Sequence, residues 1–504
     1  MNLPNGKLKK EEIDKVFSKS IKYHIDSFYT AISDYEPRQL YCHWRTLVRS
    51  IDEIINIPLE LPDDNEINQF LNLNFNFSDP NNIQKLGVVL KILENRFNKN
   101  VALRFKDLAM MCMAIDISYQ SIDFFSQQGN VFRLNNTKNA ITYLQSRRAY
   151  YITTLQLIPK IARGRKVIDY IDTLNFLQYP MDNCLVQITT AYYNLLLNNC
   201  LTDFEIDSNG TIAKSNFEYD HLEGFFMEPE RLSLLDQMEL RPETVISKQM
   251  LPKAVHNIFS FSEVANTMIL FEGAFDKYKI QNNIEYKELN LLMYEIAIFL
   301  KDDFNITIDE DIFYNISSKY KSLMLFNPSD NYFDNLNSYS PFQKFEGKLY
   351  TTVVLLNKFI YRTLSQSLLK NRTFQIHSGF IFEDKVSRVL ETKGYKPTSI
   401  KRINHKEFDL ITIKDNKVFN FQCKNNFIDI SRINYNLKKI TRFNQRLCRY
   451  YENAIIKEEK REHFINSRTG ISDIQHFVIS RYPIISRNKK IINFTELDNW
   501  NSDK

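Results

Sequence analysis

The sequence predicts a multidomain protein in which a large, mostly α-helical N-terminal region precedes a C-terminal α/β domain. Three observations carry this prediction. A chain of 504 residues is long enough for about three domains of ordinary size. Only 11 Gly and 14 Pro interrupt it, which favours long helices with short connections. Apolar residues recur at helical spacing through the first part of the chain, whereas short runs rich in Phe, Ile and Val follow near the end.

The pattern changes at two places, and we divide the chain there. This predicts a helical domain over 1–200, a second helical region over 201–373 and an α/β domain over 374–504. In the first domain, apolar periodicity predicts helices at 10–32, 37–57, 64–74, 80–97, 101–126, 137–160 and 165–199. Glu36-Pro37 is a typical first-turn start for the second of these helices.

The second region mixes turn formers with helical segments. An Asn-Gly pair inside FEIDSNGTIAKSNFEY predicts a small hairpin, and the acidic stretch 226–243 predicts a connector. Helical periodicity resumes at 251–272 and 285–304, and the turn-rich segment 327–341 follows. A long amphipathic helix, which would connect this region to the α/β domain, is predicted from about Phe345 to Leu369.

The α/β domain opens with a helix over GFIFEDKVSRVLETKGY, which ends at Gly394. Its apolar face is formed by Phe382, Val386, Val389 and Leu390. Three strands are then expected, at SIKRIN, EFDLITI and KVFNFQCKNN, with a turn at 414–416 between the last two. A helix at about 433–460 and strands at 474–483 and 489–494 complete the order helix–strand–strand–strand–helix–strand.

Four polar residues appear in order on this helix and these strands: Glu383, Asp409, Gln422 and Lys424. Gln422 and Lys424 are two apart on one strand and share a face, and Asp409 is expected in the middle of the neighbouring strand. Converging carboxylate and amide oxygens suit a hard divalent ion, with the Cys423 carbonyl as a further ligand. A lysine beside such an ion would position an attacking water for phosphodiester hydrolysis.

This ordered set resembles the PD-(D/E)xK nuclease superfamily over about 374–504, and Gln-Cys-Lys is similar to the Q-x-K variant of Mrr-type restriction nucleases. The resemblance implies a restriction-endonuclease-like fold of order αβββαβ. It implies an endonuclease that hydrolyses DNA with Mg²⁺ or Mn²⁺, in restriction or antiphage defence. Its catalytic residues would be Glu383, Asp409, Gln422 and Lys424. The metal would be held by Asp409, Gln422, Glu383 and the carbonyl of Cys423. Gln422 replaces the commoner acidic residue and removes one negative charge.

The second helix of this domain has a basic face, formed by Lys438, Arg442, Arg446 and Arg449. Residues 374–504 hold 25 Lys and Arg against 15 Asp and Glu, a net charge of +10, so the rest of the chain carries −5 of the total of +5. Concentrated positive charge is the expected footprint of a polyanionic partner. We therefore expect the basic face and Tyr435 to contact the DNA backbone.

Two other functions fit parts of the sequence. The C-terminal domain would serve as a non-catalytic, nucleic-acid-binding adaptor if the helical region recruits a partner, although retention of all four site residues argues against this. Arg38 and His43 match the R-x4-H spacing of HEPN-type ribonucleases, which implies an RNA-cutting toxin. The same spacing recurs at Arg372 and His377, where it has no evident meaning.

Location and partners follow from what the sequence lacks. The N-terminal residues have no apolar signal core, and no apolar run approaches the ~20 residues that span a bilayer. The six cysteines form no CxxC pair. These features predict a cytoplasmic protein with reduced thiols and no membrane contact. Besides DNA, the sequence leaves open a partner protein or a second copy of the chain bound through the helical region.

Overall fold

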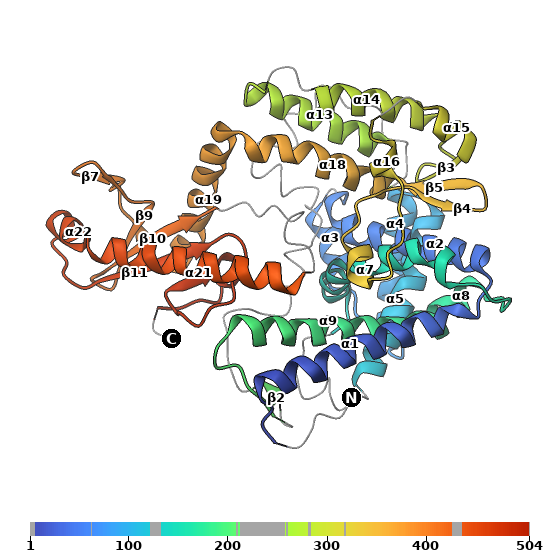
Figure 1. The fold of residues 1–504 in the computed structure, drawn as a ribbon, viewed down its shortest axis with the longest axis horizontal. Helices are drawn as coiled ribbons and strands as arrows, with labels where there is room; N and C mark the ends of the chain where they lie inside the picture. Colours follow the sequence, from blue (N-terminus) through green and yellow to red (C-terminus); the bar gives the residue numbers. More distant parts are fainter. Residues whose placement is uncertain are drawn as a thin grey trace. The chain divides into compact units, whose positions relative to one another are not determined.

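The chain forms two compact units in a computed structural model that describes residues 6–61, 63–120, 133–207, 210–211, 258, 261–280, 284–316, 319–425 and 436–502 (Figure 1). Unit 1 comprises Met1–Lys22, Ile188–Pro242 and Gln366–Lys504. Unit 2 comprises Tyr23–Gln187 and Glu243–Ser365. The N-terminal region is mostly helical and a mixed five-stranded sheet lies near the C-terminal end, which confirms a helix-rich region combined with an α/β domain.

The first part of the chain folds into helices close to the predicted ranges. They are α1 (Lys10–Ser33), α2 (Pro37–Asn56), α3 (Asp64–Leu71), α4 (Pro80–Arg96), α5 (Lys99–Gln120), α7 (Thr137–Ile161) and α9 (Gln178–Cys200). Glu36 caps α2 through its side chain, which accepts from the Arg38 and Gln39 amides, and Pro37 occupies the first turn. The segment before α9 differs from the prediction: it begins at α8 (Tyr170–Asp172) and passes through the π-helical turn η2 (Thr173–Leu177).

Buried polar contacts join the helices of unit 2. The Trp44 indole on α2 donates to the carbonyl of Tyr151 on α7 at 2.9 Å. The Glu53 carboxylate, 2% exposed, accepts from Arg49 at 3.0 Å and from Arg104 on α5 at 2.6 and 2.7 Å. A buried carboxylate shared by two guanidinium groups fixes α2 against α5, because moving either helix would leave a charge unpaired in the core.

Unit 2 also contains a small antiparallel sheet that the sequence analysis missed. Its strands are β3 (Asn305–Asp309), β4 (Gln343–Phe345) and β5 (Lys348–Thr352), in the order β3-β5-β4. The predicted helix from Phe345 to Leu369 is therefore wrong in its first part, and α18 begins only at Val353 (Val353–Lys370). Glu346 and Gly347 adopt φ of 48° and 72°, a tight turn that no helix accommodates.

The other elements of this region are short helices and one small hairpin. The helices are α13 (Ser262–Lys277), α14 (Ile284–Ala297), α15 (Glu310–Asn315), α16 (Lys321–Met324) and α17 (Tyr332–Leu336). In unit 1, β1 (Ile206–Asp207) and β2 (Gly210–Thr211) pair antiparallel, as the predicted hairpin requires. Ser208, Asn209 and the connector 226–243 lie outside the described residues.

The mixed sheet of unit 1 has the strand order β12-β11-β10-β9-β6. Its strands are β6 (Lys396–Pro397), β9 (Leu410–Lys414), β10 (Lys417–Lys424), β11 (Ile474–Ser480) and β12 (Ile491–Asn493). β6, β9 and β10 are antiparallel neighbours, whereas β10, β11 and β12 run parallel. The parallel step needs a crossover, which α21 (Leu437–Glu459) and α22 (Glu462–Thr469) supply.

The first predicted strand of this domain, SIKRIN, is not a core strand. The sheet uses Lys396 and Pro397 instead, and SIKRIN contributes β7 (Arg402–Ile403) to a separate hairpin with β8 (Lys406–Glu407). Asn404 and His405 adopt φ of 46° and 63° and form the tight turn between these two strands. This excursion places Lys401 beside the predicted catalytic residues.

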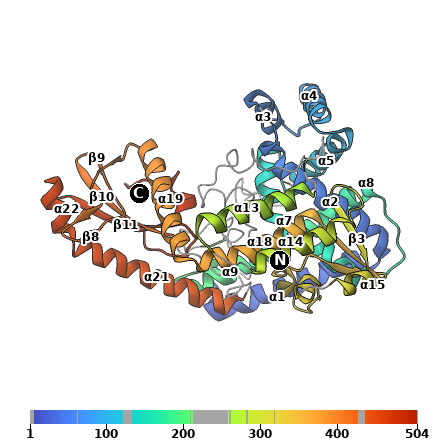
Figure 2. The same cartoon turned by 90° about the horizontal axis from the view of Figure 1, so that it is seen from above.

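Two helices cover opposite faces of the sheet (Figure 2). On one face, α19 (Arg372–Thr392) packs Phe382, Val386 and Leu390 against Phe419 and Phe421 of β10. The Trp500 ring lies in the same cluster, with centroids 5.9 Å from Phe421 and 5.1 Å from Phe477. On the other face, α21 packs Leu447, Tyr451 and Ile455 against Val478 and Ile491. The helices therefore hold β10 and β11 rigidly from both sides.

A buried polar contact fixes α21 on its face of the sheet. The Asn420 amide of β10 donates to the Glu458 carboxylate of α21 at 3.2 Å and lies 3.1 Å from Nδ1 of His476 on β11. Burial lowers the pKa of His476 to about 4, so the imidazole is neutral at neutral pH.

Candidate active site

The site lies where β9 and β10 separate. Asp415 and Asn416, at φ of 50° and 60°, form the predicted turn, and the ladder runs from Lys417↔Lys414 to Phe421↔Leu410. Asp409 precedes β9, so the expectation that it lies mid-strand is wrong. The ladder has already ended at this residue, which frees its side chain to bond across the gap.

The Asp409 carboxylate closes this gap. Its Oδ2 accepts from the Cys423 backbone amide of β10 at 2.8 Å. Burial raises the pKa of Asp409, while the Lys424 ammonium, the Cys423 amide and Lys401 act in the opposite direction. A carboxylate held by a backbone amide cannot rotate away, so Asp409 presents its other oxygen in a fixed direction.

Glu383 reaches the same place from α19. Burial and the nearby Asp409 charge raise the pKa of Glu383 to about 7, and Lys401 lowers it. The Lys401 ammonium lies 3.5 Å from Oε2 of Glu383 and donates to the Asp409 carbonyl at 2.8 Å. Two carboxyl groups therefore meet in a half-buried place where they repel each other, which is the electrostatic condition that a bound cation relieves.

Gln422 and Lys424 share one face of β10, as their spacing predicts, and the structure turns this face to α21. The Lys424 ammonium donates to Oε1 of Gln422 at 3.2 Å and lies 5.9 Å from the ring centroid of Tyr450 on α21. The predicted metal ligand Gln422 thus has its amide oxygen engaged by its own neighbour. Cys423 points to the other face, where its side chain packs with the α19 cluster and burial raises the pKa of its thiol.

The four predicted residues are drawn together mainly through Asp409. Its carboxylate accepts from the Cys423 amide between Gln422 and Lys424, which contact each other, and Lys401 joins its carbonyl to the Glu383 carboxylate. Within the described part of the chain, no group of three or more His, Cys, Asp and Glu side chains is placed to hold a metal ion. The oxygen donors here are two carboxylates, one amide and backbone carbonyls.

Sequence reasoning missed two cations at this site. Lys401 went unnoticed because SIKRIN was expected to be a core strand. Arg481 follows β11, and its backbone amide donates to the Lys424 carbonyl at 3.1 Å, while its guanidinium donates to Asn425 at 3.1 Å. Asn425 in turn donates to Ser378 of α19 at 3.1 Å. The available signal for Arg481 was its position at the end of a strand parallel to β10, because such ends converge on one edge.

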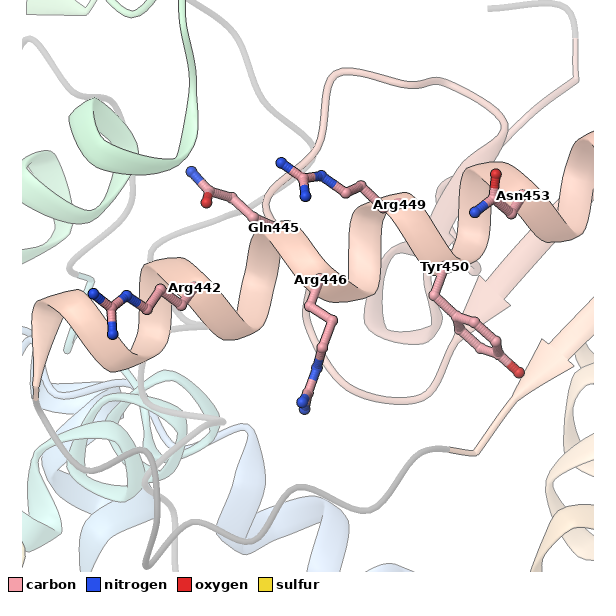
Figure 3. Close-up of a pocket in the computed structure, with 6 residues that line it drawn as sticks. All are labelled: Arg442, Gln445, Arg446, Arg449, Tyr450 and Asn453. Atoms are coloured by element: carbon pink, nitrogen blue, oxygen red, sulfur yellow. The ribbon is translucent and has the colours of Figure 1, made fainter.

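The predicted basic face is exposed on α21. Arg442, Arg446 and Arg449 line a surface pocket of about 440 Å³ together with Gln445, Tyr450 and Asn453 (Figure 3). We call this the α21 pocket. Lys438 is exposed one turn before Arg442 and is not among the residues that line the pocket. Tyr435 lies outside the described residues.

Arg38 and His43 lie on α2, five residues apart. Because successive helical residues turn by about 100°, the two side chains leave different sides of the helix. Arg38 is exposed, whereas His43 is half-buried with its ring 6.2 Å from that of Tyr170. The geometry gives this pair no shared surface.

Nothing in the described residues forms a helix that is both long and apolar enough to cross a membrane. Comparison of the chain with protein-family models, with curated proteins and with solved structures gives no match. The assignment of a function therefore rests on the geometry of the site alone.

Proposed function

We propose that this protein is a metal-dependent endonuclease that hydrolyses DNA phosphodiester bonds, in restriction or antiphage defence. The observation that carries the proposal is the fixed Asp409 carboxylate, which is bonded to the Cys423 amide and electrostatically coupled to both Glu383 and Lys424. The order α19, β6, β9, β10, α21, β11 supports a restriction-endonuclease-like αβββαβ core around it.

The residues present fit a divalent cation. Glu383 and Asp409 are hard oxygen donors. Burial and the Asp409 charge raise the pKa of Glu383, and a bound cation would favour its ionised form. Mg²⁺ is commonly held by one or two protein carboxylates, with water and substrate phosphate completing its shell. Asp409, Glu383, the Cys423 carbonyl and Gln422 would hold Mg²⁺ or Mn²⁺. The ion would lower the pKa of a bound water and offset charge on the phosphate.

Side chains of the protein orient the attacking water and the scissile phosphate. The Lys424 ammonium, held by Gln422, donates a hydrogen bond to the attacking water and aligns it with phosphorus. The Cys423 amide keeps the Asp409 carboxylate in place. Lys438, Arg442, Arg446 and Arg449 contact backbone phosphates and fix the scissile bond relative to β10.

The test is cleavage of plasmid DNA with Mg²⁺ or Mn²⁺ by the full-length protein and by Lys424→Ala and Asp409→Ala variants. We expect each substitution to reduce the rate by roughly a thousandfold, because each removes a group that acts in the transition state. Lys406→Ala, an exposed lysine on β8, should cleave like the wild type, and a chelator should stop all cleavage. Wild-type rates from both site variants would dismiss the proposal.

A non-catalytic, nucleic-acid-binding adaptor is a second candidate, and two observations favour it. Lys424 engages Gln422, and within the described residues the site lacks a third acidic ligand. An adaptor would bind nucleic acid equally well with and without metal and would cleave nothing. Binding without metal-stimulated cleavage would therefore select this candidate.

A further inference from the structure

The α21 pocket combines two chemistries on one helix face. Its residues recur at intervals of three and four along α21: Arg442, Gln445, Arg446, Arg449, Tyr450 and Asn453. All three arginines are exposed, and none of them forms an ion pair with a carboxylate of the described residues. Unpaired guanidinium groups in register attract phosphates.

Phosphate binding does not explain why an exposed aromatic residue, Tyr450, lines this pocket. Its ring is 52% exposed at the edge of this cationic face, and it extends from the same side of α21 as Arg446 (Figure 3). This ring lines the same pocket as the three arginines, and the Lys424 ammonium lies 5.9 Å from its centroid. An accessible aromatic face within a cationic groove is the arrangement by which proteins stack unpaired bases.

Duplex DNA offers little to such a ring, since its bases are already stacked on their own neighbours. An unpaired nucleotide offers a free base face for Tyr450 to stack on. The phosphate of that nucleotide is only one sugar away from its base. A base stacked on Tyr450 therefore brings its own phosphate towards Lys424.

We propose that the α21 pocket binds an unpaired nucleobase next to the scissile phosphate, so that the substrate is single-stranded or locally unpaired nucleic acid. The position of the scissile phosphate rests on the proposed nuclease function, whereas base binding by the pocket is separable from it. Arg442, Arg446 and Arg449 hold the flanking phosphates, and Tyr450 selects for the presence of a base.

The experiment measures binding of the full-length protein in chelator, where no metal-dependent cleavage occurs. Fluorescein-labelled probes are an oligothymidylate, an abasic oligonucleotide with the same number of phosphates, and a blunt hairpin duplex. We expect the oligothymidylate to bind roughly ten- to a hundredfold more tightly than the abasic strand, the range of one stacked base. The hairpin should also bind more weakly than the oligothymidylate.

Variants then test whether Tyr450 causes the preference for the base-bearing strand over the abasic one. Tyr450→Ala should bind both single strands with the affinity that the wild type has for the abasic one. Tyr450→Phe keeps the ring and should keep the preference, as should Tyr294→Ala, which removes a 66% exposed tyrosine on α14. Equal wild-type affinity for base-bearing and abasic strands, tightest binding to the hairpin, or a preference that survives Tyr450→Ala would overturn the inference. A base preference without any Mg²⁺- or Mn²⁺-stimulated cleavage would leave the pocket assigned and reject the nuclease.

Discussion

Lys401 connects the Glu383 carboxylate to the backbone of Asp409. It donates to the Asp409 carbonyl at 2.8 Å and lies 3.5 Å from the Glu383 carboxylate, so a single side chain spans α19 and the start of β9. Its ammonium lowers the pKa of Glu383, which burial and Asp409 raise to about 7. At the scale of single residues, Lys401 is thus a positioning residue whose cation offsets part of the charge between Glu383 and Asp409.

Lys401→Ala should slow cleavage by roughly tenfold at neutral pH, because a hydrogen bond to a charged group is lost at a partly exposed position. Removing the cation raises the pKa of Glu383 further, so a rate that needs the ionised carboxylate rises only at higher pH. The acid limb of the rate–pH profile should therefore shift to higher pH. Lys406→Ala on the same hairpin is the control, and an unmoved acid limb in Lys401→Ala would contradict this role.

The end of α19 sets the entry into the sheet. Gly394 adopts φ of 85°, and the Tyr395 amide donates to the Leu390 carbonyl at 3.1 Å, which ends the helix and directs the chain into β6. A Cβ on Gly394 would meet only the Lys414 side chain, at 4.0 Å, so space is not the constraint. Gly379 lies inside the same helix with nothing near its Cβ position.

These two glycines should respond to alanine in opposite directions. Gly394→Ala forces a side chain into the left-handed region and should lower the free energy of unfolding by about 1 kcal/mol. Gly379→Ala reduces the backbone freedom of the unfolded chain at a helix-interior position. It should therefore raise the free energy of unfolding by about 0.5–1 kcal/mol. Urea-dependent hydrogen exchange of peptides from β10 and β11 measures both. The same sign for both substitutions would refute the explanation.

Sequence reasoning predicted the elements that local signals specify and missed those that depend on distant partners. Long periodic helices such as α2 and α21 and the turn at Asp415 and Asn416 were located because capping, period and turn chemistry act within a few residues. The sheet β3-β5-β4 was missed because Asn305 pairs with Thr352, far along the chain. Helical spacing of Leu349 and Val353 also concealed the turn at Gly347.

The candidate site was predicted to a similar extent. Spacing alone placed Gln422 and Lys424 on one face of a strand. The bond between Asp409 and Cys423, the engagement of Gln422 by Lys424 and the arrival of Lys401 depend on where the β9–β10 ladder ends. No local pattern in the sequence fixes that point.

At the scale of the whole molecule, charge is divided unevenly along the chain. Residues 374–504 carry +10 and the remainder −5. Polyanion binding should therefore be strongly salt-dependent and should depend on α21 rather than on the helical region.

A variant with Lys438, Arg442, Arg446 and Arg449 all changed to Ala should show a flatter plot of log affinity for DNA against log salt concentration. Each phosphate contact contributes about −0.9 to that slope for duplex DNA and about −0.7 for a single strand, so the loss of four contacts should reduce it by roughly 3. The matched control neutralises the same number of exposed lysines on α4 and α5: Lys85, Lys91, Lys99 and Lys106. An equal change of slope in both variants would show that binding is not localised on α21.

The chain contains two tryptophans, and they fall in different units: Trp44 is buried on α2 in unit 2, and Trp500 lies against Phe421 and Phe477 in unit 1. Intrinsic fluorescence therefore has one reporter in each unit. Tryptophan emission comes only from unit 2 in a Trp500→Phe protein, and only from unit 1 in a Trp44→Phe protein. Comparing the two emission signals during denaturation separates the unfolding of unit 1 from the unfolding of unit 2 without dividing the polypeptide.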